Sequence, residues 1–257
     1  MQDEMISSLV RQATDPVQYD HGNIDWIKHG TITNPLRIFF LGALYAAIGD
    51  LAGKSVLEIG SGTGWLLDDF LKHGKAASVL GVEPSVQNVQ YSRSMYPDVP
   101  TVHSSLRDFS STQRFDAVAL VMVTEHLLDL QQMFAQLNGL LSRYGKIAIL
   151  TFNSDYARTP RFDYEIVACP LEETDTWVVK TARPSVRGSD TLYDIVRTPA
   201  VFKKHAEAAG LRLTQHVPLK PTPEFLAARS KYSLFADTVM YDLFVFEKGN
   251  IFQSGTR

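Results

Sequence analysis

The chain has 257 residues, of which 45% are hydrophobic and 21% are charged, a composition typical of a globular protein with a sizeable core. Its 25 Lys and Arg residues against 28 Asp and Glu residues give a net charge of −3, without the basic stripe that a nucleic-acid partner requires. The one cysteine, Cys169, excludes an internal disulfide and favours a reducing compartment.

Residues 1–50 are predicted to form a helical N-terminal cap. Residues 5–12 have an amphipathic pattern, and an apolar helix begins at Pro35. The apolar run at 38–48 is too short to span a bilayer, and the acidic N-terminus lacks the basic region of a signal peptide. We therefore expect a cytoplasmic protein with no membrane partner.

Residues 55–151 alternate between predicted strands and helices, which indicates a parallel, doubly wound sheet. With those that follow later in the chain, the expected strands are 55–59, 78–82, 101–103, 117–121, 146–151, 211–217 and 238–247. The expected helices between them are 65–73, 85–95, 130–141, 198–209 and 224–232. Ligands bind such sheets outside the carboxyl ends of the strands, so residues at those ends are candidate site residues.

Residues 153–190 interrupt the alternation and are interpreted as an insertion that covers the site. The chain at 51–248 is otherwise expected to form one ligand-binding domain, followed by a frayed tail at 249–257. Four arginines of the insertion either bind an anionic substrate or are solvated loop charges. They are Arg158, Arg161, Arg183 and Arg187.

A glycine-rich loop, Gly60-Ser61-Gly62-Thr63-Gly64, follows the first expected strand. Glycine has no Cβ, so a ligand can lie directly on this backbone. Glu83 ends the second strand, 23 positions after Gly60, and a carboxylate there can accept both hydroxyls of a ribose. Trp65 stands where a dinucleotide fingerprint needs a small residue, and no P-loop pattern is present. The pattern indicates a nucleoside ligand without a pyrophosphate.

Together these motifs resemble those of the class I S-adenosylmethionine-dependent methyltransferases. The glycine loop and the acidic strand end are similar to the first and second motifs of that family. A Glu-His pair after the expected fourth strand and the helix-turn-strand that follows it also resemble the family pattern. The segments that carry the resemblance are 56–64, 81–85, 115–118, 123–127 and 140–147.

The resemblance implies an α/β fold with a doubly wound, mostly parallel seven-stranded sheet, an antiparallel last strand, a helical N-terminal cap and an insertion after the fifth strand. It implies S-adenosyl-L-methionine as methyl donor and S-adenosyl-L-homocysteine as product. The methyl group is expected to pass to an O or N atom of a small molecule, in a site that the N-terminal cap and the insertion cover. C-methylation or cyclisation with the same cofactor, and a non-catalytic cofactor-binding module, remain alternatives. Neither a metal ion nor a nucleic acid is expected, and a homodimer is compatible with the sequence.

The resemblance also implies which residues bind the cofactor. The glycine loop would lie along its methionine and ribose portions, Glu83 would hold the ribose hydroxyls, and Glu58 would support the amino group. Ser105 stands where many members carry an Asp that accepts from the adenine, and the backbone of Leu106 would donate to the same ring. The full predicted set is Glu58, Gly60, Ser61, Gly62, Gly64, Glu83, Pro84, Ser105, Leu106, Val121 and Met122.

Methyl transfer depends chiefly on alignment of the acceptor, and a base is needed only where the acceptor arrives protonated. His126 and Tyr19 are the predicted catalytic residues, because His126 follows the fourth strand and Tyr19 can close over the cofactor. His126 can instead pack the start of a helix, and Tyr19 can fasten the N-terminal segment. His21, His29 and Asp155 are further candidates for contact with the substrate.

Overall fold

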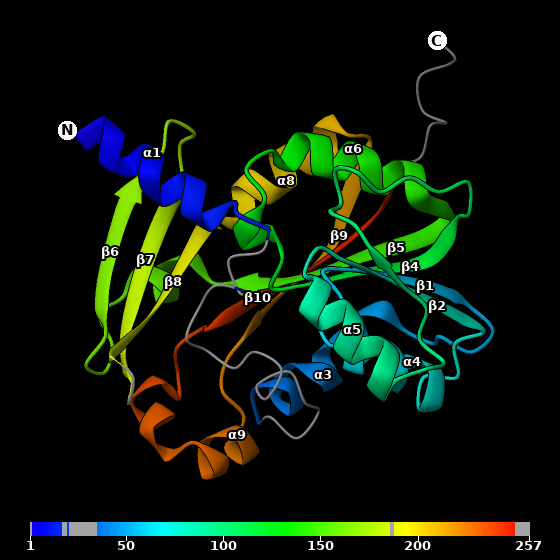
Figure 1. Cartoon of the computed structure of the whole chain (residues 1–257), viewed down its shortest axis with the longest axis horizontal. Helices are drawn as coiled ribbons and strands as arrows, with labels where there is room; N and C mark the ends of the chain where they lie inside the picture. The colour runs from blue at the N-terminus through cyan, green and yellow to red at the C-terminus, as the bar shows by residue number, and fades with distance from the viewer. Residues whose placement is uncertain (1, 17–19, 21–34, 186–187, 250–257) are drawn as a thin grey trace.

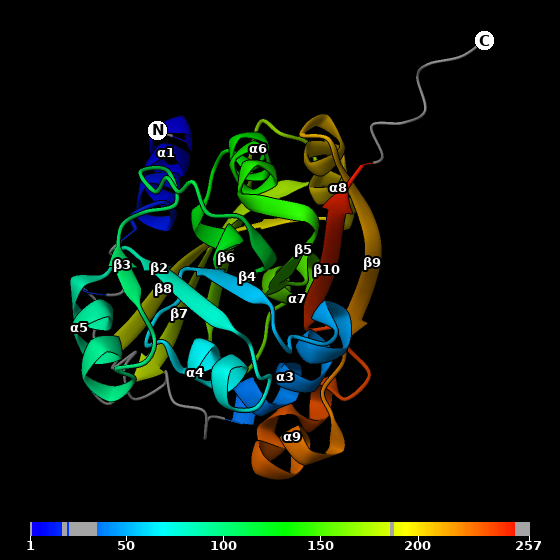
Figure 2. The same ribbon diagram turned by 90° about the vertical axis from the view of Figure 1, so that its right-hand side faces the viewer.

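The computed structural model describes residues 2–16, 20, 35–185 and 188–249, and its centre is a seven-stranded sheet (Figure 1). The strand order is β3-β2-β1-β4-β5-β10-β9, with β3 and β9 at opposite edges (Figure 2). β10 runs antiparallel to both of its neighbours, whereas β1, β2, β3, β4 and β5 pair in parallel. The predicted doubly wound sheet with an antiparallel last strand is therefore confirmed. The strands are β1 (Ser55–Ile59), β2 (Ser78–Glu83), β3 (Thr101–His103), β4 (Phe115–Val121), β5 (Leu141–Phe152), β9 (Leu211–Leu219) and β10 (Tyr241–Lys248).

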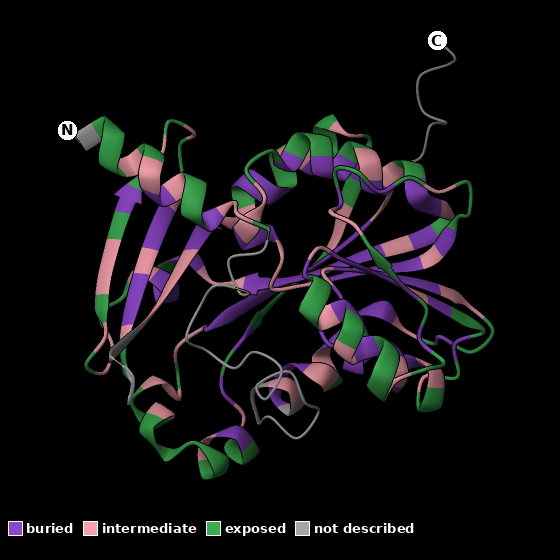
Figure 3. Ribbon diagram, in the orientation of Figure 1, coloured by how far each residue is buried: buried purple, intermediate pink, exposed green. Residues whose placement is uncertain are grey.

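Helices cover both faces of this sheet. One face packs against α3 and α4, the other against α6 and α8, and each interface is an apolar cluster. The strands at the centre of the sheet are buried along most of their length, while the helices expose their outer faces (Figure 3). The helices are α1 (Gln2–Ala13), α3 (Pro35–Ile48), α4 (Trp65–Lys72), α5 (Val86–Met95), α6 (Leu130–Leu140), α7 (Ser154–Arg158), α8 (Pro199–Ala208) and α9 (Pro223–Ala228), with the 3₁₀ turns η2 (Thr124–His126) and η3 (Ser230–Phe235).

The insertion forms a second sheet of three antiparallel strands, β6 (Glu165–Pro170), β7 (Thr176–Ser185) and β8 (Gly188–Arg197). It extends seven residues beyond the predicted end at 190, because β8 runs to Arg197. Alternate residues of β7 and β8 face opposite sides, as the pleat requires. Val178 and Ile195 pack against Leu9 of α1, and Val179 and Val196 pack against Ala157 of α7.

The two described helices of the predicted N-terminal cap lie in different parts of the molecule. α1 covers the outer face of the second sheet, whereas α3 packs on the large sheet (Figure 1). Cys169 lies buried beneath α1 as a free thiol. Among the described residues, none of the helices combines the length and apolarity needed to cross a membrane.

Arg197 joins the second sheet to the large one. Its side chain is 2% exposed and donates hydrogen bonds to the carbonyl oxygens of Thr124, Leu127 and Leu128 at 2.9, 2.6 and 3.1 Å. These carbonyls belong to η2 and the turn that follows it. The end of β8 is thereby fixed to the turn that carries the predicted Glu-His pair.

We expect Arg197→Met to lower the free energy of unfolding by about 2–4 kcal/mol, because three charge-assisted hydrogen bonds are lost and buried carbonyls lose their donors. Arg197→Lys should lose less, since it keeps the charge but not the planar fork. Urea denaturation measures both. A Met variant as stable as the wild-type protein would contradict this account of how the two sheets are joined.

Candidate functional site

A cavity of about 420 Å³ lies between the carboxyl ends of β1, β2 and β4 and the second sheet. Its floor is formed by the glycine loop and by the residues that end these parallel strands. Its roof comes from α7, β7, β8 and η3, with one side closed by α3. A cavity with convergent polar groups at this edge of a parallel sheet is where a ligand is expected.

The backbone of the floor adopts conformations that few side chains tolerate. Gly60 and Gly62 have φ angles of 66° and 53°, in the left-handed region. A Cβ atom on Gly60 would lie 2.5 Å from a methyl group of Val123, so this position requires glycine. Met122, where β4 ends, is also left-handed with a φ of 57°. Such strain in a non-glycine residue is typical of functional sites.

Glu83 anchors the glycine loop from the end of β2. Its carboxylate accepts hydrogen bonds from the backbone N–H of Gly62 at 2.8 Å, from that of Ser85 at 2.9 Å, and from the Asn88 amide at 3.4 Å. Burial raises the pKa of the Glu83 carboxyl, and these donors oppose the shift. Two carboxylate oxygens have about four lone-pair sites, so acceptor capacity remains on Glu83 for a ligand.

Glu58 and Arg37 place opposite charges in one part of the cavity. Glu58 comes from β1 and is 3% exposed, and Arg37 comes from α3, where its guanidinium lies 4.4 Å from the centre of the Trp65 ring. Oε2 of Glu58 and Nη1 of Arg37 are buried and have no hydrogen-bond partner among the described residues. Burial raises the pKa of Glu58 well above its usual value and lowers the pKa of Arg37 to about 10, and each charge partly offsets the other's shift. Buried atoms of this kind indicate a ligand with a cation and an anion.

The cavity brings together most residues of the predicted cofactor set. Ten of the eleven line it, namely Glu58, Gly60, Ser61, Gly62, Glu83, Pro84, Ser105, Leu106, Val121 and Met122. Gly64 lies at the start of α4 with a φ of 81°, and a Cβ atom there would meet Ser92 of α5. Ser105 donates its hydroxyl to Asp108 at 2.6 Å.

The predicted catalytic residue His126 lies in the cavity wall, where its imidazole is buried and hydrogen-bonded to α1. His126 Nδ1 lies 3.2 Å from the carbonyl oxygen of Ala13 in α1, and burial lowers the pKa of its imidazole to about 4. The ring is therefore neutral at physiological pH and donates to Ala13. Tyr19, His21 and His29 lie outside the described residues.

The arginines of the insertion divide into two groups. Arg158 lies with its guanidinium 3.8 Å from the centre of the Trp177 ring and pairs with Asp155, whose side chain is 83% exposed, so neither reaches the cavity. Arg161 and Arg183 line it, and Nε of Arg183 is buried without a hydrogen-bond partner in the part of the chain that the structure describes. Arg187 lies outside the described residues.

The roof contains groups that the sequence analysis did not select. Asp194 of β8 lines the cavity, and burial raises the pKa of its carboxyl to about 7, with a further contribution from Glu125. Glu125 accepts hydrogen bonds from the Thr151 hydroxyl and the Phe152 N–H at 2.8 and 2.9 Å. Four tyrosines complete the aromatic part of the lining: Tyr156, Tyr164, Tyr232 and Tyr241.

The signals of the missed residues are faint in the sequence. Arg37 is the one cation of the apolar segment Pro35–Ile48. Asp194 is one carboxylate between Tyr193 and Ile195, in the stretch 191–197 that lies beyond the predicted insertion and was assigned no element. Arg37 and Asp194 can be recognised as site residues only once the structure shows that α3 and β8 pack beside the ends of the parallel strands.

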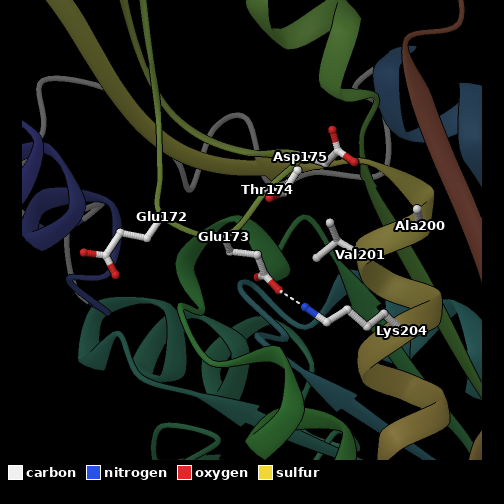
Figure 4. A pocket seen from close by; sticks show the side chains of 7 residues that line it. All are labelled: Glu172, Glu173, Thr174, Asp175, Ala200, Val201 and Lys204. Carbon is white, nitrogen blue, oxygen red and sulfur yellow. Dashed lines mark hydrogen bonds and ion pairs between the residues drawn. The ribbon is translucent and has the colours of Figure 1, made fainter.

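A second cavity of about 390 Å³ lies between the turn after β6 and helix α8 (Figure 4). Glu173 accepts hydrogen bonds there from Lys204 at 3.0 Å and from His205 at 2.6 Å. Burial would raise the pKa of Glu173, but these two donors outweigh it and the pKa is lowered. Glu173, Lys204 and His205 are hydrogen-bonded to one another. This surface hollow therefore differs from the first cavity, where buried charged groups lack hydrogen-bond partners among the described residues.

Comparison with known proteins finds one family model, described as a methyltransferase domain, that matches residues 37–216. The chain is similar to ubiquinone biosynthesis O-methyltransferases. That of Nitrobacter winogradskyi is 27% identical over 71% of this chain and 69% of the relative, and that of Rhodopseudomonas palustris is 25% identical over 79% of each.

Solved structures of the same fold include an S-adenosylmethionine-dependent methyltransferase from Mesorhizobium loti, with a TM-score of 0.64 and 19% identity over 81% of this chain and 97% of that one. A glycopeptide N-methyltransferase solved with S-adenosyl-L-methionine has a TM-score of 0.61 and 15% identity, over 82% of this chain and 93% of that one.

Proposed function

The chain belongs to the class I S-adenosylmethionine-dependent methyltransferases, and we propose that it methylates a hydroxyl oxygen of a small aromatic molecule. Methyl transfer from S-adenosylmethionine to an O or N atom of a small molecule is the activity of this enzyme. The choice of oxygen is supported by the relatives named as ubiquinone biosynthesis O-methyltransferases. The aromatic acceptor is supported by the ring-lined roof.

The residues at the strand ends fit the cofactor. Its methionine portion carries an ammonium and a carboxylate, which complement the unpartnered Oε2 of Glu58 and Nη1 of Arg37. Its ribose carries two vicinal hydroxyls: one can donate to the acceptor site that remains on Glu83, and the other can take the place of the long contact from Asn88 at 3.4 Å. This charge complementarity of buried, unpartnered atoms is the observation that carries the assignment.

Aromatic side chains of the roof, and of β5 and β10 in the large sheet, supply an apolar wall for the acceptor. Phe152 and Tyr241 stack with ring centroids 5.3 Å apart, and Tyr156 packs edge-on against Phe235 at 5.6 Å. Burial raises the pKa of Tyr156 and of Tyr241, so both phenols are neutral. Rings in such a wall favour an aromatic partner through stacked and edge-on contacts.

In this mechanism the protein contributes alignment and exclusion of water. S-adenosylmethionine supplies, when bound, an electrophilic methyl group on a sulfonium whose sulfur leaves as a neutral thioether. Glu83, Glu58 and Arg37 would hold it at the strand ends, and the aromatic lining would orient the acceptor in line with the methyl group. The low pKa of His126 and its bond to Ala13 support a role in holding α1 against η2.

Labelled S-adenosylmethionine tests the proposal with a matched pair of acceptors, catechol and o-phenylenediamine, which differ in oxygen against nitrogen. Calorimetry first establishes that the cofactor binds. We expect transfer of label to catechol and little to the diamine. Transfer to the diamine alone would overturn the choice of oxygen, and transfer to neither by cofactor-saturated enzyme would overturn the aromatic acceptor.

A further inference from the structure

Four residues of the second sheet face the cavity from two adjacent strands. Thr181 and Arg183 alternate along β7, and Leu192 and Asp194 alternate along β8. In the antiparallel register Thr181 pairs with Leu192, and Asp194 pairs with Val179. Arg183 and Asp194 therefore lie on one continuous face, with the Thr181–Leu192 pair between them.

Asp194 is a buried carboxylate to which none of the residues that the structure describes donates a hydrogen bond. The residue is 8% exposed, and the causes that shift the pKa of its carboxyl are burial and neighbouring charges. The charged groups that act on it are Glu125 from η2, Arg161 from the segment after α7, and Arg183. A structural carboxylate this deeply buried is normally paired or hydrogen-bonded.

Two cations flank the same part of the cavity. Nη1 of Arg161 is committed to the carbonyl oxygens of Tyr156, Ala157 and Thr159, at 2.8, 3.1 and 3.0 Å. Nε of Arg183 is buried and has no hydrogen-bond partner within the described ranges, although Asp190 stands opposite Arg183 in the register. A guanidinium with a buried, unused N–H is suited to a carboxylate or a similar anion.

We propose that Asp194 is the general base of the reaction and that Arg183, assisted by Arg161, binds an anionic substituent of a hydroxylated aromatic acceptor. This inference rests on the proposed function. As the acceptor oxygen forms its bond to the methyl carbon, the O–H bond breaks and the proton passes to the Asp194 carboxylate. The electron pair of the breaking carbon–sulfur bond goes to sulfur, so atoms and charge balance.

The environment of Asp194 suits this task. Burial raises the pKa of its carboxyl to about 7, and Glu125 adds to the shift while Arg161 and Arg183 oppose it. A base is most effective when its pKa lies close to the operating pH. His126, with a pKa of about 4, is a much weaker proton acceptor.

The first test compares 3,4-dihydroxybenzoate with catechol, which differ by one carboxylate. Binding to the full chain saturated with S-adenosylhomocysteine is followed by fluorescence. We expect the wild-type protein to bind the benzoate at least tenfold more tightly, and Arg183→Met to lose that preference while binding catechol as before. An unchanged preference in the variant would overturn the role of Arg183.

The second test measures methyl transfer to the same probes by Asp194→Asn, with Asp163→Asn as a control at an exposed carboxylate outside the cavity. We expect Asp194→Asn to lose at least about 100-fold in kcat while binding the cofactor and both probes normally. Wild-type kcat/KM should rise with pH through an apparent pKa near 7, and the variant should lack this limb. A variant within fivefold of wild type, or one that keeps the limb, would overturn the role of Asp194.

Thermal melting provides a readout independent of turnover. Because the folded-state pKa of Asp194 lies above its unfolded value near 4, the native protein loses stability relative to Asp194→Asn as pH rises from about 4 to about 7. The variant should therefore melt several degrees higher at pH 8, with a gap that narrows towards pH 4. A variant that melts lower at pH 8 would contradict the assignment. If the wild-type protein methylates catechol but these variants behave as wild type, the inference fails and the proposed function stands.

Discussion

Glu83→Gln is expected to bind S-adenosylhomocysteine about 100-fold more weakly than the wild-type protein. The amide has one acceptor oxygen where the carboxylate has two, so it cannot serve Gly62, Ser85 and two ribose hydroxyls together. Loss of charge-assisted hydrogen bonds to a buried diol costs about 3 kcal/mol, which corresponds to this factor.

Isothermal titration calorimetry measures the effect, with Glu173→Gln as the matched control. Glu173, like Glu83, is a hydrogen-bonded carboxylate, but its donors are the side chains of Lys204 and His205 in the surface hollow near α8. The control should bind the cofactor as the wild-type protein does. Equal affinity of Glu83→Gln and wild type would remove Glu83 from the cofactor site.

Arg37→Gln and Glu58→Gln are expected to bind S-adenosylhomocysteine about 10- to 100-fold more weakly, while binding 5′-methylthioadenosine, which lacks the amino-acid tail, as the wild-type protein does. The reason is that, in the proposed binding mode, these two residues would face the charges of the tail and not the nucleoside. Competition binding with the two ligands separates this effect from that of Glu83→Gln, which should weaken both.

Release of a proton when S-adenosylhomocysteine binds is a second test of the roles of Glu58 and Arg37. Burial raises the pKa of Glu58 well above its usual value, so part of the population carries a proton before an ammonium approaches. Binding should release that proton, which calorimetry in buffers of different ionisation enthalpy detects. Glu58→Gln should show less release. Equal weakening of both ligands by Arg37→Gln, or equal proton release by Glu58→Gln, would contradict the assignment.

The sequence predicts the floor of the site well because the rule that governs it is local. A parallel strand followed by a helix places the next residues at the carboxyl edge, so Gly60 and Glu83 could be located from the strand pattern, and the family resemblance added Glu58 and Met122. The fold class follows from the same alternation. Strand boundaries were less well predicted: β5 begins at Leu141, where the pattern had placed the end of a helix.

The roof could not be predicted, because it depends on how an inserted sheet docks. The alternation of Leu192, Asp194 and Val196 shows that these residues share a face, but not which layer that face meets. The docking of the second sheet is fixed by Arg197, which donates hydrogen bonds to carbonyl oxygens more than 65 positions away in the sequence. The surroundings of His126 also depend on a distant contact. Its position after β4 suggested a base, but its imidazole donates a hydrogen bond to the carbonyl oxygen of Ala13 in α1.

A crystal structure of the full chain with S-adenosylhomocysteine tests the central claim most directly. The account predicts the two ribose hydroxyls within about 2.6–3.2 Å of the Glu83 carboxylate, the amino group at Glu58 and the carboxylate at Arg37. It also predicts that the sulfur faces the tyrosine-lined roof. A nucleoside bound away from Glu83, or an amino-acid tail turned away from Glu58 and Arg37, would contradict it.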